Sequence, residues 1–197
     1  MSDNHLIVFV KQPIEGKVKT RIAQTKGNEI ALEVYTNLLE KTKQIIGKAN
    51  CHIHLFVEGE LTFFRNWTYN TVHKQQGSNL GERMLFAFET VFNLFPNSNC
   101  IIIGSDCYEL TSKMIDEAFE KLDNNNYVIG PANDGGYYLL GMKILLPALF
   151  QNIIWSTNKV YTQTIAHIGH AIILPALSDI DLWEDVLNNP SLLEKIK

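Results

Sequence analysis

Short apolar runs recur along the chain, each ended by glycine, proline or a cluster of polar residues. The run from Cys100 to Ile103 contains three β-branched residues and is followed by Gly104, which is typical of a strand buried on both faces. Runs of this length that are rich in β-branched and aromatic residues predict strands. We expect strands at 6–10, 52–57, 71–74, 100–103, 127–129, 137–142 and 171–174.

Longer segments between these runs carry apolar residues at helical spacing. The segment from Asn28 to Ile46 is the longest, and Gly47 ends it. Asn79, Thr111 and Thr157 precede other such segments and are expected N-caps. Strands that alternate with helices predict a three-layer α/β fold, in which helices cover both faces of a mostly parallel sheet. The polar loops at successive strand ends then share one edge of that sheet.

Length and composition narrow the class of protein. With 197 residues and no linker-like stretch, the chain is expected to form a single domain, residues 1–197. The net charge of -4 argues against a broad basic surface for nucleic acid. The apolar run at 6–10 is too short for a signal peptide or a membrane span, so we expect a cytoplasmic protein. Cys51, Cys100 and Cys107 show no Cys-x-x-Cys spacing and are expected to be reduced thiols.

Asp106 is the central candidate for chemistry. It follows the strand at 100–103 and the turn at Gly104, and therefore lies just beyond the carboxyl end of a predicted central strand. Open α/β sheets collect ligand-binding groups in the crevice at that edge. An aspartate that only caps a turn is the alternative, and this stretch alone leaves both interpretations open.

The loop from Lys11 to Arg21 holds four cationic residues at the end of the first predicted strand. Pro13 and Gly16 break regular structure there, and clustered cations with exposed backbone N–H groups suit a di- or triphosphate. The spacing matches neither a Walker A loop nor a Rossmann glycine motif. A solvated basic loop without a ligand is the alternative.

Two further polar loops follow predicted strands. In loop 75–83, Gln76 offers the paired donor and acceptor of an amide, which suit the edge of a nucleobase, although the loop is also an ordinary helix start. In the loop after the strand at 127–129, Asp134 is followed by Gly135 and Gly136, where the missing Cβ atoms let a ligand approach the backbone. A hairpin turn of the Asp-Gly type is the alternative there.

Two other groups of polar residues permit more than one interpretation. Asp181 and Glu184, three residues apart before a predicted helix, match a capping box. The two aspartates of that loop, one of them Asp181, equally suit a metal site begun by Asp106. His52 and His54 point to one face of a predicted strand, and with no third ligand nearby in the sequence we favour a sheet-face pair over a metal pair.

Five motifs, taken in order, resemble those of one bacterial family. They are Phe-Val-Lys-x-Pro-x-x-Gly-x-Val-Lys-Thr-Arg, Gln-Gly-x-x-Leu-Gly-Glu-Arg-Met, Ile-Gly-Ser-Asp-Cys, Gly-Pro-Ala-x-Asp-Gly-Gly-Tyr-Tyr-Leu-Leu-Gly and Asp-Ile-Asp-x-x-Glu-Asp. The family is a little-characterised group of bacterial transferases placed with the nucleotide-diphospho-sugar transferases of the GT-A fold. It is more distantly similar to phospholactate guanylyltransferase and the molybdenum-cofactor nucleotidyltransferases.

This chain departs from the family pattern in two places. Tyr108 stands where the family usually has proline, and Leu182 with Trp183 stands where related chains tend to show Thr-Pro. We expect Tyr108 to reshape or partly fill the acceptor side of the site. Asp106 itself matches the motif.

The resemblance implies a GT-A-type fold and a metal-dependent transferase that uses a nucleotide-activated donor. A glycosyltransferase that acts on a nucleotide-diphospho-sugar and a small-molecule acceptor is the first expectation. The alternative is a guanylyl- or cytidylyltransferase-like enzyme that attacks a nucleoside triphosphate and releases pyrophosphate. A third possibility is a nucleotide-binding module without catalysis. A homodimer is also possible.

The resemblance also implies roles at the donor side of the site. The groups that neutralise the nucleotide phosphates are the side chains of Lys11, Lys19 and Arg21 and the backbone near Gly16. Gln76 and Gly77 border the base. Mg²⁺ or Mn²⁺ is held by Asp106 and Asp181 together with phosphate oxygens.

Further roles concern the reaction and the acceptor. Lys19, Asp106 and Asp134 are the implied catalytic residues. Asp134 orients or deprotonates the incoming hydroxyl, and Gly135 and Gly136 face the sugar or acceptor.

Overall fold

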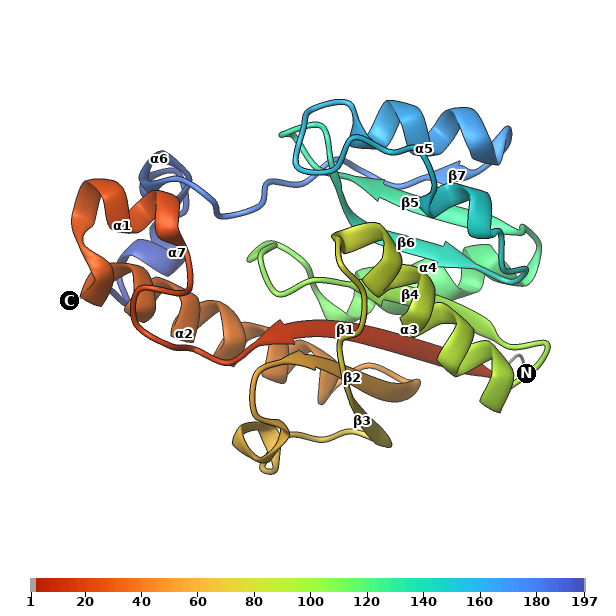
Figure 1. The fold of residues 1–197 in the computed structure, drawn as a ribbon, viewed down its shortest axis with the longest axis horizontal. Helices are drawn as coiled ribbons and strands as arrows, with labels where there is room; N and C mark the ends of the chain where they lie inside the picture. The colour runs from red at the N-terminus through yellow and green to blue at the C-terminus, as the bar shows by residue number, and fades with distance from the viewer. Residues whose placement is uncertain (1–2, 197) are drawn as a thin grey trace.

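The computed structural model describes residues 3–196, in which one seven-stranded sheet has helices on both faces (Figure 1). The strands are β1 (Asn4–Lys11), β2 (His52–Glu58), β3 (Thr71–Lys74), β4 (Asn99–Ile103), β5 (Tyr127–Pro131), β6 (Tyr137–Met142) and β7 (Ile172–Ile173). Their order across the sheet is β3-β2-β1-β4-β6-β5-β7. β6 runs antiparallel to both neighbours, and every other pair is parallel. The predicted α/β fold with a mostly parallel sheet is confirmed.

The helices match the expected segments with some differences at their ends. They are α1 (Thr20–Lys26), α2 (Asn28–Ile46), α3 (Leu80–Leu94), α4 (Ser112–Asp123), α5 (Val160–Ile168), α6 (Trp183–Leu187) and α7 (Pro190–Leu193), with short 3-10 helices η1 (Leu61–Phe64) and η2 (Pro147–Phe150). Asn79 and Thr111 accept hydrogen bonds from the first turns of α3 and α4, as expected of N-caps. Thr157 is not a cap, because α5 begins only at Val160.

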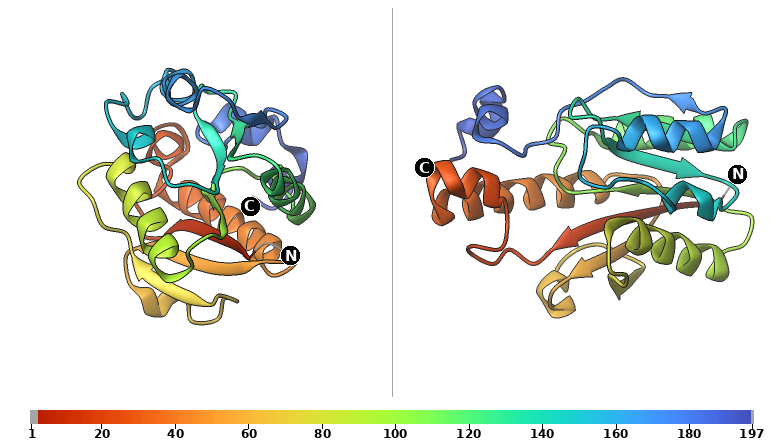
Figure 2. Two further views of the ribbon diagram at one scale, coloured as in Figure 1. Left: turned by 90° about the vertical axis from the view of Figure 1, so that its right-hand side faces the viewer. Right: turned by 45° about the horizontal axis from the view of Figure 1, so that its top comes forward.

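The sheet separates two apolar cores. Alternate residues of β1 point to opposite faces, so Leu6 and Val8 belong to the core beneath α2 and α4, while Ile7 belongs to the core beneath α3. The two further views show α2 and α4 on one side of the sheet and α3 and α5 on the other (Figure 2). Burial on both faces explains why the strands were recognisable as continuous apolar runs.

The candidate site lies where β1 and β4 end side by side. Parallel pairing brings Val8 opposite Ile103, so the loops that follow β1 and β4 leave the sheet at one edge. The C-terminal segment returns to this edge, where the backbone N–H of Ile180 donates to the carbonyl of Asp106 at 2.9 Å. It then forms α6 and α7 beside α1 (Figure 1). Three segments that are distant in sequence therefore meet around Asp106.

The structure bears on two expectations, the absence of a membrane span and the reduced state of the cysteines. None of the helices between residues 3 and 196 combines the length and the apolar character that a membrane crossing requires. The three cysteines are free thiols, as expected, and Cys100 and Cys107 are buried.

Candidate active site

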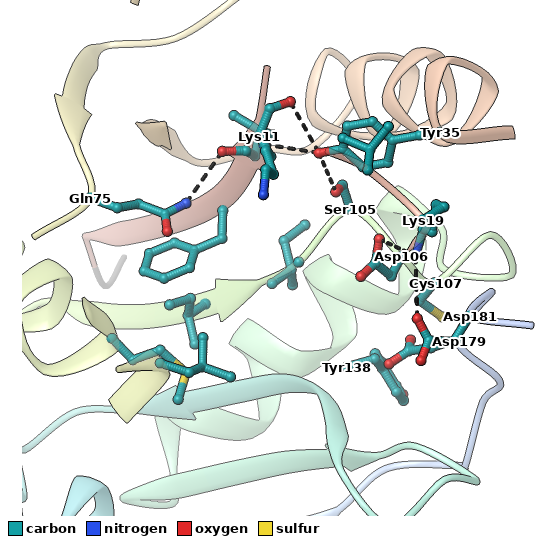
Figure 3. Close-up of a pocket in the computed structure, with 18 of the residues that line it drawn as sticks. Lys11, Lys19, Tyr35, Gln75, Ser105, Asp106, Cys107, Tyr138, Asp179 and Asp181 are labelled. Atoms are coloured by element: carbon teal, nitrogen blue, oxygen red, sulfur yellow. Dashed lines mark hydrogen bonds and ion pairs between the residues drawn. The ribbon is translucent and has the colours of Figure 1, made fainter. Parts of the chain in front are cut away.

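A cavity of about 480 Å³ opens at the carboxyl ends of β1 and β4. Its charged end is formed by Lys19, Arg21, Asp106, Asp179 and Asp181. Its apolar end is formed by Phe9, Leu80, Met84, Ile102 and Tyr137. The close-up shows Gln75 on the side of the cavity away from the aspartates, with Lys11 between Gln75 and Asp106 (Figure 3). The cavity thus joins an ionic region to an apolar one, as a site for a molecule with both characters requires.

Lys19 forms the centre of the charged end. Its Nζ lies 2.8 Å from Oδ1 of Asp106 and 4.0 Å from Oδ1 of Asp181, and only 5% of its side chain is exposed. An ammonium removed from water in this way needs carboxylate partners, because burying an unpaired charge is costly. The two predicted metal ligands therefore converge on one buried cation.

The backbone of Lys19 is held in an unusual conformation. Its φ of 44° and ψ of 47° lie in the left-handed region, although it is not glycine. Such a conformation costs of order 1–3 kcal/mol and persists only where the surroundings enforce it. Here Lys19 precedes α1, and its carbonyl accepts the N–H of Ala23 at 2.9 Å. The strained residue is the one whose side chain contacts the aspartates of the charged end.

Asp181 faces the same cations because another residue caps the helix that follows it. Oδ2 of Asp185 accepts the backbone N–H groups of Asp181 and Leu182, at 2.9 and 2.7 Å. The predicted capping box of Asp181 with Glu184 is therefore wrong. The side chain of Asp181 instead accepts a hydrogen bond from Nη1 of Arg21 at 2.7 Å.

Asp179 is a third aspartate of the charged end, and with Asp181 it is one of the two loop aspartates that the sequence suggested for a metal site. Burial, together with the nearby charges of Asp106 and Asp134, raises its pKa from 3.8 to about 7, against the opposite effect of Lys19. The Asp-Ile-Asp motif is the sequence feature that places Asp179 here. Ile180 is buried and its N–H binds the carbonyl of Asp106, so the two flanking aspartates lie beside Asp106.

Tyr35 and Ser105 join the ends of β1 and β4. The hydroxyl of Tyr35 accepts the N–H of Lys11 at 2.9 Å and lies 3.1 Å from the Lys11 carbonyl. It is also 3.4 Å from Oγ of Ser105. Burial raises the pKa of Tyr35, so the phenol stays protonated. Tyr35, on α2, thus links the start of the cationic loop to the loop that contains Asp106. No sequence pattern predicted this role.

Lys11 stands at the mouth of the cavity beside Glu58. Its Nζ lies 2.9 Å from Oε1 of Glu58, while Nη1 of Arg83 lies 3.0 Å from Oε2. Partial burial raises the pKa of Glu58, but the two cations together hold it below its ordinary value. Glu58 thus pairs with two cations, of which Lys11 lines the cavity.

Several residues expected at the site do not line this cavity. They are Gly16, Gln76, Gly77, Asp134, Gly135 and Gly136. Gln76 is exposed, and its neighbour Gln75 lines the cavity instead. The ligand contacts expected of these six residues stay predictions.

The loop of Asp134 has a structural explanation of its own. Oδ1 of Asp134 accepts the N–H of Gly136 at 2.8 Å, as in the turn between antiparallel β5 and β6. At Gly135 φ is 92°, and a Cβ would collide with the backbone of Asn158. The close approach that requires a glycine is therefore made by the protein's own chain. Asp134 still acts on the charged end through its effect on Asp179.

Tyr108 does not line this cavity, and its expected effect on the acceptor side stays a prediction. It is buried against α7, where its hydroxyl donates to the carbonyl of Ser191 at 3.3 Å. The ammonium groups of Lys41 and Lys195 lie over its ring, 5.3 and 5.6 Å from the centroid. Tyr108 thus anchors the C-terminal segment that carries Asp179 and Asp181.

The charged end suits a divalent cation only in part. Asp106 and Asp181 offer hard oxygen ligands that face one point, and Mg²⁺ commonly takes one or two carboxylates and completes its shell with phosphate and water. Within residues 3–196, no cluster of three or more His, Cys, Asp or Glu side chains is arranged as a metal cage. The two carboxylates therefore fit a metal whose remaining ligands come from phosphate and water.

The fold and the position of the cavity define an α/β protein of the GT-A and nucleotidyltransferase-like class. Residues 41–157 match the family described as "Uncharacterized protein conserved in bacteria (DUF2064)", and the chain belongs to this family. The resemblance found in the five motifs is thereby confirmed. No curated protein matches the chain.

Solved structures share the fold. A protein from Desulfovibrio desulfuricans G20, provisionally named a nucleotide-diphospho-sugar transferase, is 28% identical with a TM-score of 0.89, over 99% of this chain and 95% of that one. The 4-diphosphocytidyl-2C-methyl-D-erythritol synthase of Anaerococcus prevotii DSM 20548 is 10% identical with a TM-score of 0.60, over 98% and 96%. Rv0371c of Mycobacterium tuberculosis H37Rv, in a complex with manganese, is 14% identical with a TM-score of 0.54, over 98% of both chains.

Proposed function

We propose that the protein is a metal-dependent transferase that binds a nucleotide-activated donor, and that it transfers a sugar from a nucleotide-diphospho-sugar to a small acceptor. One observation carries this proposal: Lys19, Asp106 and Asp181 meet at the charged end of a cavity whose other end is apolar. The similarity to the protein of Desulfovibrio desulfuricans G20 supports the same donor class.

In this proposal, the cationic loop binds the diphosphate. Lys11 and Arg21 lie at the cavity wall and carry charges that suit phosphate oxygens, with backbone N–H groups near Gly16 adding donors. Arg21 presents a fork of donors, and its side chain is 61% exposed, so it can leave Asp181 for a phosphate at small cost. Lys19 moves its ammonium from Asp106 to the donor as the phosphates enter.

Asp106 and Asp181 then hold Mg²⁺ or Mn²⁺. When bound, the ion would act as a Lewis acid toward the charge that develops on the leaving diphosphate. Asp134 orients or deprotonates the acceptor hydroxyl from the neighbouring loop, and Gly135 and Gly136 border the acceptor.

A second candidate function is nucleotidyl transfer. The shared fold of the 4-diphosphocytidyl-2C-methyl-D-erythritol synthase favours it, because a cationic loop facing two carboxylates serves attack at an α-phosphorus equally well. The products separate the two reactions: the first releases a nucleoside diphosphate and the second releases pyrophosphate. Incubation with nucleotide sugars, and separately with nucleoside triphosphates and phosphorylated acceptors, identifies which product forms.

A thermal-shift screen tests the proposal before the acceptor is known. Nucleotide sugars and nucleoside triphosphates are added with and without Mg²⁺ or Mn²⁺. A ligand at 100 times its Kd stabilises the native state by about 2.7 kcal/mol, or roughly 5–10 °C for a chain of this size. We expect hits that require the metal. Hits that ignore it and persist in Asp106→Asn would instead indicate a binding module without catalysis.

The free thiols fit the reducing cytoplasm, which we propose as the location of the protein. The sheet is continuous from β3 to β7, in keeping with the single domain predicted from the sequence. A homodimer stays a prediction.

A further inference from the structure

The C-terminal segment reaches the cavity between the loop after β5 and the loop after β4. Pairing of β7 with β5 continues past the end of β7, where the N–H of Leu177 donates to the carbonyl of Pro131 at 3.2 Å. The N–H of Asn133 in turn donates to the carbonyl of Leu177 at 2.9 Å. Further along, the N–H of Ile180 donates to the carbonyl of Asp106 at 2.9 Å. The segment is therefore attached to both loops.

Ser178 lies between these attachments and is held by one side chain from each loop. Nδ2 of Asn133 donates to Oγ of Ser178 at 2.8 Å, and the N–H of Ser178 donates to Oε2 of Glu109 at 3.1 Å. Asn133 occupies the variable position of the Gly-Pro-Ala-x-Asp-Gly-Gly motif, and Glu109 and Ser178 lie outside all five motifs. The family resemblance therefore gave these three residues no role.

These bonds fix the chain on both sides of Asp179. Asp179 lies between Ser178 and Ile180, which are both attached, and Asp181 follows Ile180 directly. Figure 3 shows Asp179 and Asp181 on the same side of the cavity as Asp106. A ligand group on a loop that is already held loses less conformational entropy when it binds, and its geometry is more precise.

We propose that Asn133, Glu109 and Ser178 are positioning residues, which set where the C-terminal aspartates present their carboxylates to the metal. The inference rests on the proposed function. None of the three needs to touch the nucleotide or the metal. Their effect is therefore expected on the part of nucleotide affinity that depends on Mg²⁺, and not on the part that the cationic loop supplies alone.

Isothermal titration calorimetry with UDP, CDP, ADP and GDP, each with and without Mg²⁺, measures this effect. The magnesium gain is the factor by which Mg²⁺ tightens binding of the diphosphate that binds best. We expect Asn133→Ala and Ser178→Ala each to reduce this gain about three- to tenfold, as the loss of one hydrogen bond implies, and to change metal-free affinity by less than about twofold. The double variant should lose no more than the larger of the two single losses, because both substitutions remove the same hydrogen bond.

Conservative variants separate positioning from a general loss of structure. Ser178→Thr keeps the hydroxyl, and Glu109→Gln keeps an acceptor oxygen, so both should retain the magnesium gain, whereas Glu109→Ala should lower it. Asn125→Ala is the matched control, since it removes a hydrogen bond from an exposed asparagine to the carbonyl of Lys121 on α4. It should leave the gain unchanged.

The possible results separate this inference from the proposed function. An unchanged gain in Asn133→Ala and Ser178→Ala, additive losses in the double variant, or equal weakening with and without Mg²⁺ overturns the inference alone. If Mg²⁺ does not tighten any diphosphate in wild type, the proposed function fails and the inference fails with it. If Asn133→Ala does not fold, the comparison of Ser178→Ala with Ser178→Thr decides.

Discussion

The ammonium nitrogen of Lys19 lies 2.8 Å from Oδ1 of Asp106, at the point where two predicted metal ligands converge. A cation already held by these carboxylates competes with any divalent ion that needs the same oxygens. The backbone of Lys19 is in the left-handed region, with φ of 44°. Metal binding is therefore expected to depend on a nucleotide that draws Lys19 toward its phosphates.

Replacing Lys19 by methionine tests this competition. Lys19→Met removes the positive charge that lies 2.8 Å from Oδ1 of Asp106, and with it the repulsion between that charge and a divalent ion at the same oxygens. We expect nucleotide-free protein to bind Mn²⁺ at least tenfold more tightly, measured by electron paramagnetic resonance of free Mn²⁺, while nucleotide affinity falls. Lys113→Met, on the exposed face of α4, is the matched control. Unchanged Mn²⁺ affinity in Lys19→Met would contradict the competition.

Replacing Asp179 by asparagine should stabilise the protein above neutral pH when metal is absent. Because folding raises the pKa of Asp179 from 3.8 to about 7, the unfolded state releases its proton first, and stability falls as pH rises through that window. We expect Asp179→Asn to be more stable by about 3 kcal/mol at pH 8 and equally stable at pH 3.5, measured by urea unfolding with EDTA. A gain that does not change with pH would show that the charge is not responsible.

A histidine network at the opposite edge of the sheet predicts acid sensitivity. Nε2 of the buried His54 lies 2.8 Å from Nδ1 of His5, and its Nδ1 lies 2.8 Å from the hydroxyl of Thr71. Burial, followed by the charges of His5 and the neighbouring histidines, lowers the pKa of His54 from 6.5 to about 4, while Asp3 acts in the opposite direction. The stability from neutral His54 is complete above pH 6.5 and is lost as pH falls through about 4.

The size of this loss can be measured by chemical denaturation. Between pH 7 and pH 4 we expect the His54 term to remove about 2 kcal/mol from the free energy of unfolding, allowing for screening by solvent. His54→Phe keeps the ring on the sheet face and should lose less stability over the same range. Parallel pH profiles for the two proteins would refute the assignment to His54.

The sequence predicted the fold and the place of Asp106 because both depend on local patterns. Apolar runs specify buried strands, and a glycine after the central strand puts the next carboxylate at the sheet edge. Lys19 and Arg21 were recognisable from their position after the first strand, but no sequence pattern showed that they face Asp181. That contact depends on the return of residues 178–182 to the end of β4.

Residues that sequence reasoning missed or misplaced depend on tertiary contacts. Gln75, rather than Gln76, lines the cavity. Successive side chains of an extended chain point in opposite directions, so an error of one position places the wrong residue in the site. Asp185 caps α6 in place of the Asp181 and Glu184 pair. Tyr108 turns away to α7, a partner more than 80 residues away that no local pattern reveals.

Metal-dependent nucleotide binding by Asp106 is the most direct test of the account. Titration calorimetry compares wild type, Asp106→Asn and the exposed-surface control Glu117→Gln, with the nucleotide identified by the thermal-shift screen and with or without Mg²⁺. We predict that Mg²⁺ tightens binding at least tenfold in wild type and in Glu117→Gln, and that Asp106→Asn folds normally but loses this gain. Equal affinity with and without Mg²⁺ in wild type, or an unchanged gain in Asp106→Asn, would contradict the account.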